Sequence, residues 1–136
     1  MKNRPRVVVD TNVLVSRLLR RRSLPAQAVD RIIQNAQLLV SEETMKELAR
    51  VLSRRKFDRY IVSEERVEFI RELSTVVEMV PIVHRIHVCR DARDDKFLEV
   101  AVNGSAQLIV TGDIDLLALH PFREIAILSP ADYLRL

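Results

Sequence analysis

Short runs of branched apolar residues recur along this chain, and they constrain its fold more than any other feature. Residues 7–9, 38–40 and 108–110 contain no polar residue at all. A strand that is apolar on both faces is typical of a parallel sheet, because helices cover both sides of such a sheet. Residues 78–83 and 125–128 offer two further strands. The runs therefore predict a largely parallel central sheet.

Segments with helical periodicity separate these runs, and several of them open on a helix start signal. Ser23 and Ser41 are favourable N-cap residues, and Ser63 is followed by two glutamates, as Ser41 is. Ser129, followed by a proline, predicts a last short helix. Strands that alternate with helices predict an α/β fold of three layers, with helices on both faces of the sheet. No repeat or Pro/Gly-rich linker divides residues 1–136, so we expect a single domain.

Composition excludes several classes of protein. No apolar run approaches the roughly 20 residues that span a bilayer, so we expect no membrane segment. Cys89 is the only cysteine, which rules out an internal disulfide and is consistent with a reducing compartment. The basic N-terminus leads into a strand rather than into a signal-peptide core, and a cytoplasmic location is therefore expected. The net charge of +3 by itself favours nucleic acid only weakly.

Acidic residues follow the predicted strands at one edge of the sheet. Asp10 ends the first strand, Glu47 lies in the helix after residues 38–40, and Asp113 closely follows residues 108–110. Asp94 and Asp95 begin the helix that follows the strand at 78–83 and its loop. Each acid alone has an ordinary explanation as a cap, turn or surface ion-pair residue. Together they indicate a site, because ligands bind beyond the carboxyl ends of strands in such sheets.

Converging carboxylates predict a bound cation. They repel one another and would raise each other's pKa unless a positive charge neutralised them. Ligand sets made only of oxygen suit hard divalent ions, which implies Mg²⁺ or Mn²⁺. Such an ion can activate water and stabilise charge on a phosphodiester. The sequence contains no phosphate-binding P-loop, dinucleotide glycine motif or hydrolase nucleophile elbow, so phosphodiester hydrolysis is the reaction that fits.

The ordered set of motifs resembles the PIN-domain family over nearly the whole chain, from Arg6 to Tyr133. The segments that carry the resemblance are residues 7–12 (VVVDTN), Glu47, residues 94–101 (DDKFLEVA) and residues 109–113 (IVTGD). The resemblance implies a metal-dependent ribonuclease in which Asp10, Glu47, Asp95 and Asp113 bind the ion. It also implies supporting roles for Thr11, Asn12 and Thr111.

The third acidic position has more than one candidate, since Asp91 and Asp94 compete with Asp95. We favour Asp95, because Leu98 and Val102 then lie three and seven residues further along its helix; Asp94 is the alternative. Asp115 and Glu99 are either supporting groups or surface acids.

A basic stripe accompanies the acid on the predicted helix around Glu47. Lys46, Arg50 and Arg54 recur every four residues and should therefore share one helix face. The stripe is either a solvated surface or a contact for RNA phosphates.

Two other functions fit parts of the pattern. A phosphatase similar to the haloacid dehalogenases would use Asp10 as its nucleophile, but that family has an acid where Asn12 stands. A binding module that retains the acids without catalysis is the non-enzymatic alternative.

The motif order resembles most the branch of the family that includes toxins of toxin–antitoxin pairs. This implies a small antitoxin as partner, whose arginine could enter an acid-lined pocket, and a homodimer. The predicted helix at 64–75 offers Val67, Ile70 and Arg71 as contact residues.

Overall fold

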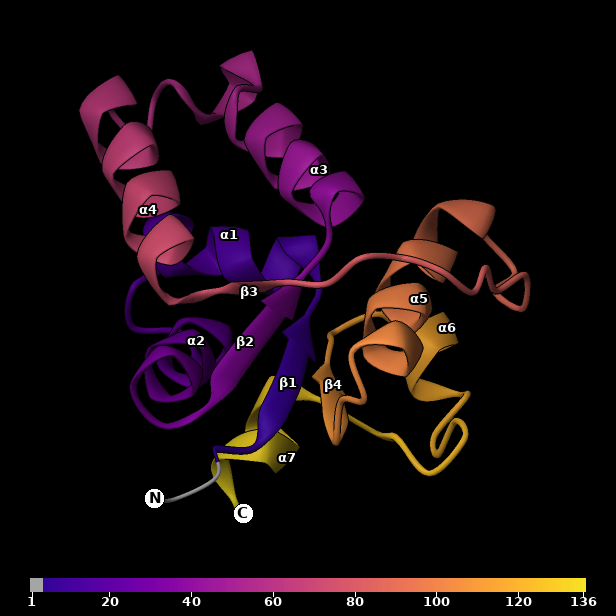
Figure 1. Ribbon diagram of the computed structural model, residues 1–136. Helices are drawn as coiled ribbons and strands as arrows, with labels where there is room; N and C mark the ends of the chain where they lie inside the picture. The colour runs from indigo at the N-terminus through magenta and orange to yellow at the C-terminus, as the bar shows by residue number, and fades with distance from the viewer. Residues whose placement is uncertain (1–3) are drawn as a thin grey trace.

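The computed structural model describes residues 4–136 and shows a parallel β-sheet between two layers of helices (Figure 1). The strands are β1 (Arg6–Val9), β2 (Gln37–Val40), β3 (Glu78–Met79), β4 (Leu108–Val110) and β5 (Ala126–Leu128). The α-helices are α1 (Thr11–Leu19), α2 (Leu24–Asn35), α3 (Glu42–Leu52), α4 (Ser63–Val76), α5 (Asp95–Asn103), α6 (Ile114–Leu117) and α7 (Pro130–Leu134). Two 3-10 helices, η1 (Arg55–Phe57) and η2 (Ala92–Asp94), complete the set. The strand order is β3-β2-β1-β4-β5 and every pairing is parallel, which confirms the predicted α/β sheet.

The central strand explains why the sheet needs helices on both faces. Val7 and Val9 are buried among the residues of α1, α2, α3, α4 and α7, whereas Val8 is buried among those of α5 and α6. Leu39 and Ile109 lie beside Val8 in register and are also fully buried. Alternate residues of one strand point to opposite faces, so a continuous apolar run requires two apolar layers.

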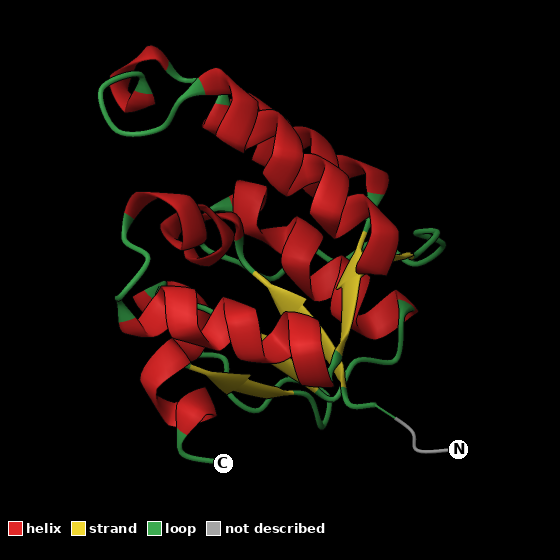
Figure 2. Cartoon of the chain, turned by 90° about the vertical axis from the view of Figure 1, so that its left-hand side faces the viewer, coloured by secondary structure: helices red, strands yellow, loops and turns green. Residues whose placement is uncertain are grey.

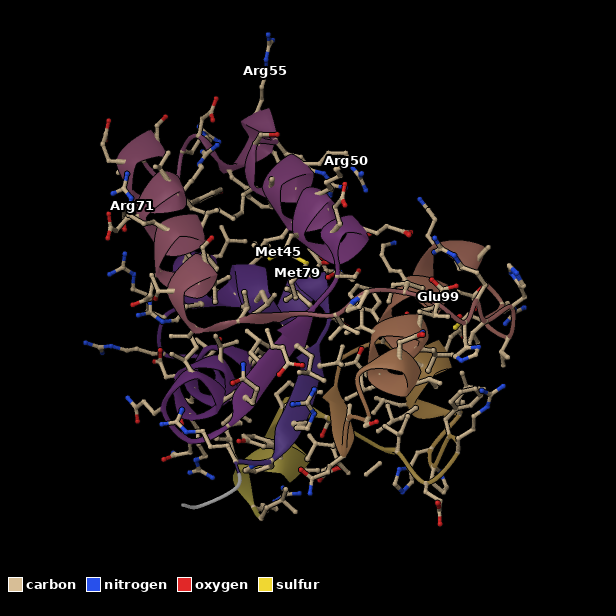
Figure 3. All side chains as sticks on the ribbon, in the orientation of Figure 1. Met45, Arg50, Arg55, Arg71, Met79 and Glu99 are labelled. Atoms are coloured by element: carbon tan, nitrogen blue, oxygen red, sulfur yellow. The ribbon has the colours of Figure 1, made fainter. Side chains whose placement is uncertain are left out.

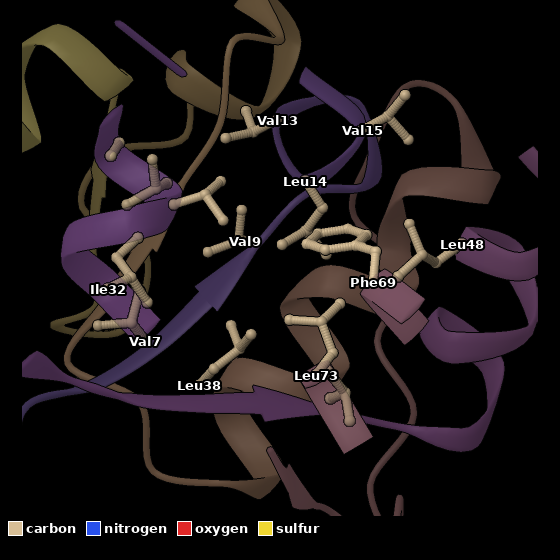
Figure 4. Packing of buried hydrophobic residues seen from close by; sticks show 14 of the residues in the cluster. Val7, Val9, Val13, Leu14, Val15, Ile32, Leu38, Leu48, Phe69 and Leu73 are labelled. Atoms are coloured by element: carbon tan, nitrogen blue, oxygen red, sulfur yellow. The ribbon is translucent and has the colours of Figure 1, made fainter. Parts of the chain in front are cut away.

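The larger helical layer contains the more extensive of the two cores. Figure 4 shows Phe69 of α4 packed beside Leu14 and Leu73, with Leu48 of α3 nearby. Figure 2 shows the helices of this layer stacked in front of the strands. None of the helices in residues 4–136 combines the length and apolar composition that a bilayer crossing needs.

Most of the predicted helix starts are confirmed. The side chains of Ser23, Ser41 and Ser129 accept backbone N–H bonds at the first turns of α2, α3 and α7. Ser63 is different, because it is the first residue of α4, and the N-cap is Val62, which has no side-chain bond to offer.

The strand predicted at 78–83 is shorter than expected. Among the strands of residues 4–136 its one neighbour is β2, and β2 ends where Ser41 turns the chain into α3. The last ladder-like contact is the bond from the backbone N–H of Val80 to the carbonyl of Val40, at 2.7 Å. Beyond it, the chain crosses to the α5 side of the sheet (Figure 1). The backbone N–H groups of Val83 and His84 there donate to the side chain of Asn103 instead of to a strand.

Candidate active site

A cleft of about 600 Å³ lies where β1 and β4 end. The acids in its lining are Asp10, Glu47, Asp91, Asp94 and Asp113. The other lining residues are Thr11, Asn12, Val13, Ser16, Pro25, Arg50, Val51, Arg54, Arg93, Phe97, Gly112 and Pro130. The cleft therefore joins segments that lie up to 120 residues apart in the sequence, from Asp10 to Pro130.

Asp10 is the most enclosed of these acids, at 7% exposure. It is the N-cap of α1, and one carboxylate oxygen accepts the backbone N–H of Val13 at 3.0 Å. The other oxygen accepts the hydroxyl of Thr111. Burial raises the pKa of Asp10, the hydrogen bonds oppose this, and the charge of Asp113 adds to the rise. Capping thus fixes the orientation of this acid without removing it from the cleft.

Asp113 and Asp94 form a second part of the acidic lining. Asp113 is the N-cap of α6, and its backbone N–H donates to the Thr111 hydroxyl at 3.0 Å. Thr111 therefore links Asp10 to Asp113. Burial and the neighbouring Asp113 carboxyl raise the pKa of Asp94 to about 6. A carboxyl pair of this kind keeps a proton to a higher pH than an isolated carboxyl does, and a bound cation would displace that proton.

Glu47 differs from the aspartates because positive and neutral donors already surround it. One carboxylate oxygen accepts the Thr11 hydroxyl at 2.5 Å, and the other lies 2.7 Å from the ammonium of Lys96. The guanidinium of Arg50 is 3.8 Å away. Burial acts to raise the pKa of Glu47, but the bonds from Lys96 and Thr11 outweigh it and the pKa is lowered. This carboxylate is therefore held as an anion.

Asp95, the favoured third acid, is not part of the lining; Asp94 is. The Asp95 carboxylate accepts the backbone N–H groups of Val88 and Cys89, at 3.1 and 2.8 Å. Burial acts to raise the pKa of Asp95, but these bonds outweigh it and the pKa is lowered. The alignment with Leu98, the basis for favouring Asp95, places it on the buried side of α5, whereas Asp94 ends η2 just before that helix.

Asp95 belongs to a ladder of three polar side chains along α5. Glu99 and Asn103 follow it at four-residue intervals, and all three hold the segment 81–91 (Glu99 is labelled in Figure 3). Their backbone partners are Val88, Cys89, Ile86, Val83 and His84. Glu99 also accepts from the guanidinium of Arg85 at 3.2 Å. Glu99 is therefore a buried structural acid rather than a surface one.

The remaining predicted supporting residues divide between the cleft and the surface. Thr11 and Asn12 both line the cleft, Thr11 as a buried residue and Asn12 as an exposed one. Asp91 lines the cleft but pairs with Arg93 at 2.8 Å. Asp115 is exposed outside the lining, and it contributes only its backbone N–H, which bonds Asp113 at 2.9 Å.

The predicted basic stripe reaches the cleft only in part. Arg50 and Arg54 line it, whereas Lys46 is 74% exposed and pairs with Glu42 at 2.9 Å. Figure 3 shows Arg50 extending from the side of α3 that faces α5, while Arg55 points away from the chain. Arg93, which the sequence pattern did not single out, adds a third guanidinium to the rim. Its only sequence signal was its place directly before the two aspartates.

The donor chemistry of the cleft fits a hard divalent cation. Its acids offer only oxygen ligands, and two of them, Asp10 and Asp94, have raised pKa values that a cation would lower. Within residues 4–136, no three acidic, histidine or cysteine side chains already stand in an arrangement that could hold a metal ion.

A PIN domain family model matches residues 6–115, which is most of the chain. The chain belongs to the PIN-domain family. An uncharacterized protein of Methanocaldococcus jannaschii is 32% identical over 117 residues, covering 85% of this PIN domain and 75% of that protein.

Solved structures show the same fold at low sequence identity. A chain of VapBC2 from Rickettsia felis, solved bound to a DNA fragment from its promoter, matches with a TM-score of 0.62 at 12% identity, covering 91% of this chain and 98% of that one. The PIN domain endonuclease Utp24 matches with a TM-score of 0.56 at 19% identity, covering 91% of this chain and 84% of that one. Mycobacterium tuberculosis VapC20, a toxin that cleaves the sarcin-ricin loop, matches with a TM-score of 0.53 at 18% identity. This match covers 88% of this chain and 98% of that one. At these identities the likeness is one of fold.

Proposed function

We propose that this PIN domain is a metal-dependent ribonuclease that hydrolyses RNA phosphodiester bonds. The observation that carries the proposal is one cleft whose lining combines the acids Asp10, Asp94 and Asp113 with three arginines, Arg50, Arg54 and Arg93. Carboxylates attract a divalent ion, and guanidinium groups bind phosphates. A cleft with both features suits a polyanionic substrate whose phosphodiester bond is hydrolysed beside a bound divalent ion.

Asp10, Asp94 and Asp113 would hold Mg²⁺ or Mn²⁺. When bound, such an ion lowers the pKa of water and stabilises charge on the phosphate that is attacked. Thr111 orients two of these acids at once, through its bonds to the Asp10 carboxylate and from the Asp113 backbone. The rim arginines would bind phosphates on either side of the scissile bond.

Two solved structures of the same fold support nuclease activity, and one of them, VapC20, supports RNA as the substrate class. Utp24 is described as an endonuclease, and VapC20 is described as a toxin that cleaves the sarcin-ricin loop. The DNA in the VapBC2 structure is a promoter fragment bound to that complex. A phosphatase using Asp10 and a non-catalytic module are the competing functions, and one experiment can distinguish all three.

The decisive experiment measures Mn²⁺-dependent cleavage of a fluorescent single-stranded oligoribonucleotide. A parallel assay measures hydrolysis of the phosphomonoester p-nitrophenyl phosphate. Asp10→Asn retains a good N-cap but removes a charge, so cleavage should fall at least about a hundredfold while the fold persists. Asp132→Asn, an exposed acid outside the cleft, is the matched control. Hydrolysis of the phosphomonoester alone would support the phosphatase, and binding of RNA without cleavage would support the module.

We further propose that the protein acts as a toxin that a small antitoxin inhibits, and that it forms a homodimer. The VapBC2 and VapC20 matches support the first part. One face of α4 could contact the antitoxin or the second copy. It carries Val67, which is 56% exposed, and Arg71, which pairs with the exposed Glu68. Ile70 is partly buried against the core. Growth arrest on expression of the wild type but not of Asp10→Asn tests the toxin role. Light scattering that shows a monomer at tens of micromolar would contradict the dimer.

A further inference from the structure

Lys96 is a buried cation that the proposed reaction does not use. It is the second residue of α5 and only 7% exposed, and its ammonium lies 2.7 Å from the Glu47 carboxylate. It also donates to the carbonyl of Arg93. A buried ammonium is costly unless it is paired, so this contact is a firm part of the structure.

The pair connects the two helical layers across the carboxyl edge of the sheet. Glu47 lies on α3, which packs on one face, and Lys96 lies on α5, which packs on the other. Thr11 at the start of α1 donates to the second Glu47 oxygen, at 2.5 Å. Both oxygens of this acid are thus bound by groups of the protein. By contrast, within residues 4–136 no lysine or arginine pairs with the carboxylates of Asp10, Asp94 or Asp113.

We propose that Lys96 is a positioning residue: it neutralises Glu47 and keeps that carboxylate from binding the divalent ion directly, which leaves Asp10, Asp94 and Asp113 as the ligands. The inference rests on the proposed function, because it concerns the ion that the cleft would hold. Glu47 still lines the cleft, and there it serves as an oriented hydrogen-bond acceptor.

The first test is the Mn²⁺ affinity of Lys96→Met, measured by calorimetry on the purified full chain. The variant frees a carboxylate and removes a positive charge beside the ion. Mn²⁺ should therefore bind at least about threefold more tightly than to the wild type, while RNA cleavage falls. Lys96→Arg retains the charge and should keep the affinity near the wild-type value. A lysine that only supports packing would give equal or weaker binding in Lys96→Met.

The second test is the double variant Glu47→Gln with Lys96→Met. Glu47→Gln alone leaves the buried ammonium unpaired and weakens Mn²⁺ binding at least about threefold by repulsion. Removing the lysine as well should restore the affinity to within about threefold of the wild type, since neither of the two replaced groups is a ligand. If Glu47 binds the ion directly, the double variant stays weak and the proposal is wrong.

The two proposals fail in different ways. A wild type that binds no Mn²⁺ contradicts the metal-dependent function and this inference together. A wild type that binds Mn²⁺ and cuts RNA, with no gain in Lys96→Met and no restoration in the double variant, contradicts the positioning role alone. Should Lys96→Met fail to fold, the double variant decides, because it buries no unpaired charge.

Discussion

Asp94 and Asp95 are adjacent in the chain but serve different parts of the molecule. Asp94 lines the cleft beside Asp113, whereas the Asp95 carboxylate accepts the backbone N–H groups of Val88 and Cys89. Successive side chains of a helix point about 100° apart. At the junction between η2 and α5, Asp94 and Asp95 can therefore contact different parts of the molecule. Substituting each of these two residues in turn therefore tests which one belongs to the site.

Asp94→Asn should weaken Mn²⁺ binding and cleavage by about tenfold or more, because it removes a charge from the proposed ligand set. Asp95→Asn retains an oxygen that can accept both backbone bonds, and should leave cleavage within a few-fold of the wild type. Calorimetry with Mn²⁺ and the oligoribonucleotide assay measure the two effects. The reverse ranking would restore Asp95 as the third acid.

The raised pKa of Asp94 predicts how the metal-free protein responds to pH. The folded chain binds this proton up to about pH 6, whereas an aspartate in the unfolded chain loses it near pH 4. The native state therefore holds more protons in that interval, and the stabilisation present below pH 4 is lost as the pH rises through 6. Thermal unfolding in EDTA should show this loss in the wild type and a smaller one in Asp94→Asn. Identical pH profiles would indicate that Asp94 titrates normally.

The rim arginines should contribute to RNA affinity in a salt-dependent way. Replacing Arg50, Arg54 or Arg93 by alanine should weaken binding and reduce the salt slope by roughly one unit for each phosphate that the protein no longer binds. Lys46→Ala is the matched control, because Lys46 lies on α3 outside the cleft. Fluorescence anisotropy from low to moderate salt, in the Asp10→Asn background, measures the slope. Equal slopes for all four variants would exclude a specific role for the rim.

Gly104 should be intolerant of a side chain, for packing reasons alone. A β-carbon there would lie 2.9 Å from side-chain atoms of Leu39 and Val80 and from the carbonyl of Val100. Gly104→Ala should therefore reduce the free energy of unfolding by about 1–3 kcal/mol. At Gly112 a β-carbon meets no atom within 4 Å, so Gly112→Ala is the control. Urea unfolding measures both, and equal reductions would contradict the packing explanation.

Local sequence was sufficient for the strands, most helix starts and the edge at which the acids lie. The valines of 7–9 predict a strand buried on both faces, and Ser41 predicts the start of α3, because apolar periodicity and capping act over a few residues. Asp10 and Asp113 do line the cleft at that edge, and for the same reason: each closely follows a buried strand. The length of β3 was not predictable in this way, since its partner strand ends after Val40.

Only the tertiary structure decided which neighbouring side chains enter the cleft. The rotation of α5 about its axis is set by the packing of Leu98 and by the bonds from 81–91 to Asp95, and neither can be read from the helix alone. The same rotation brings Lys96 to Glu47, 49 positions earlier in the chain. Contacts between residues so far apart depend on how whole elements pack, whereas sequence periodicity reports only which face of each element is apolar.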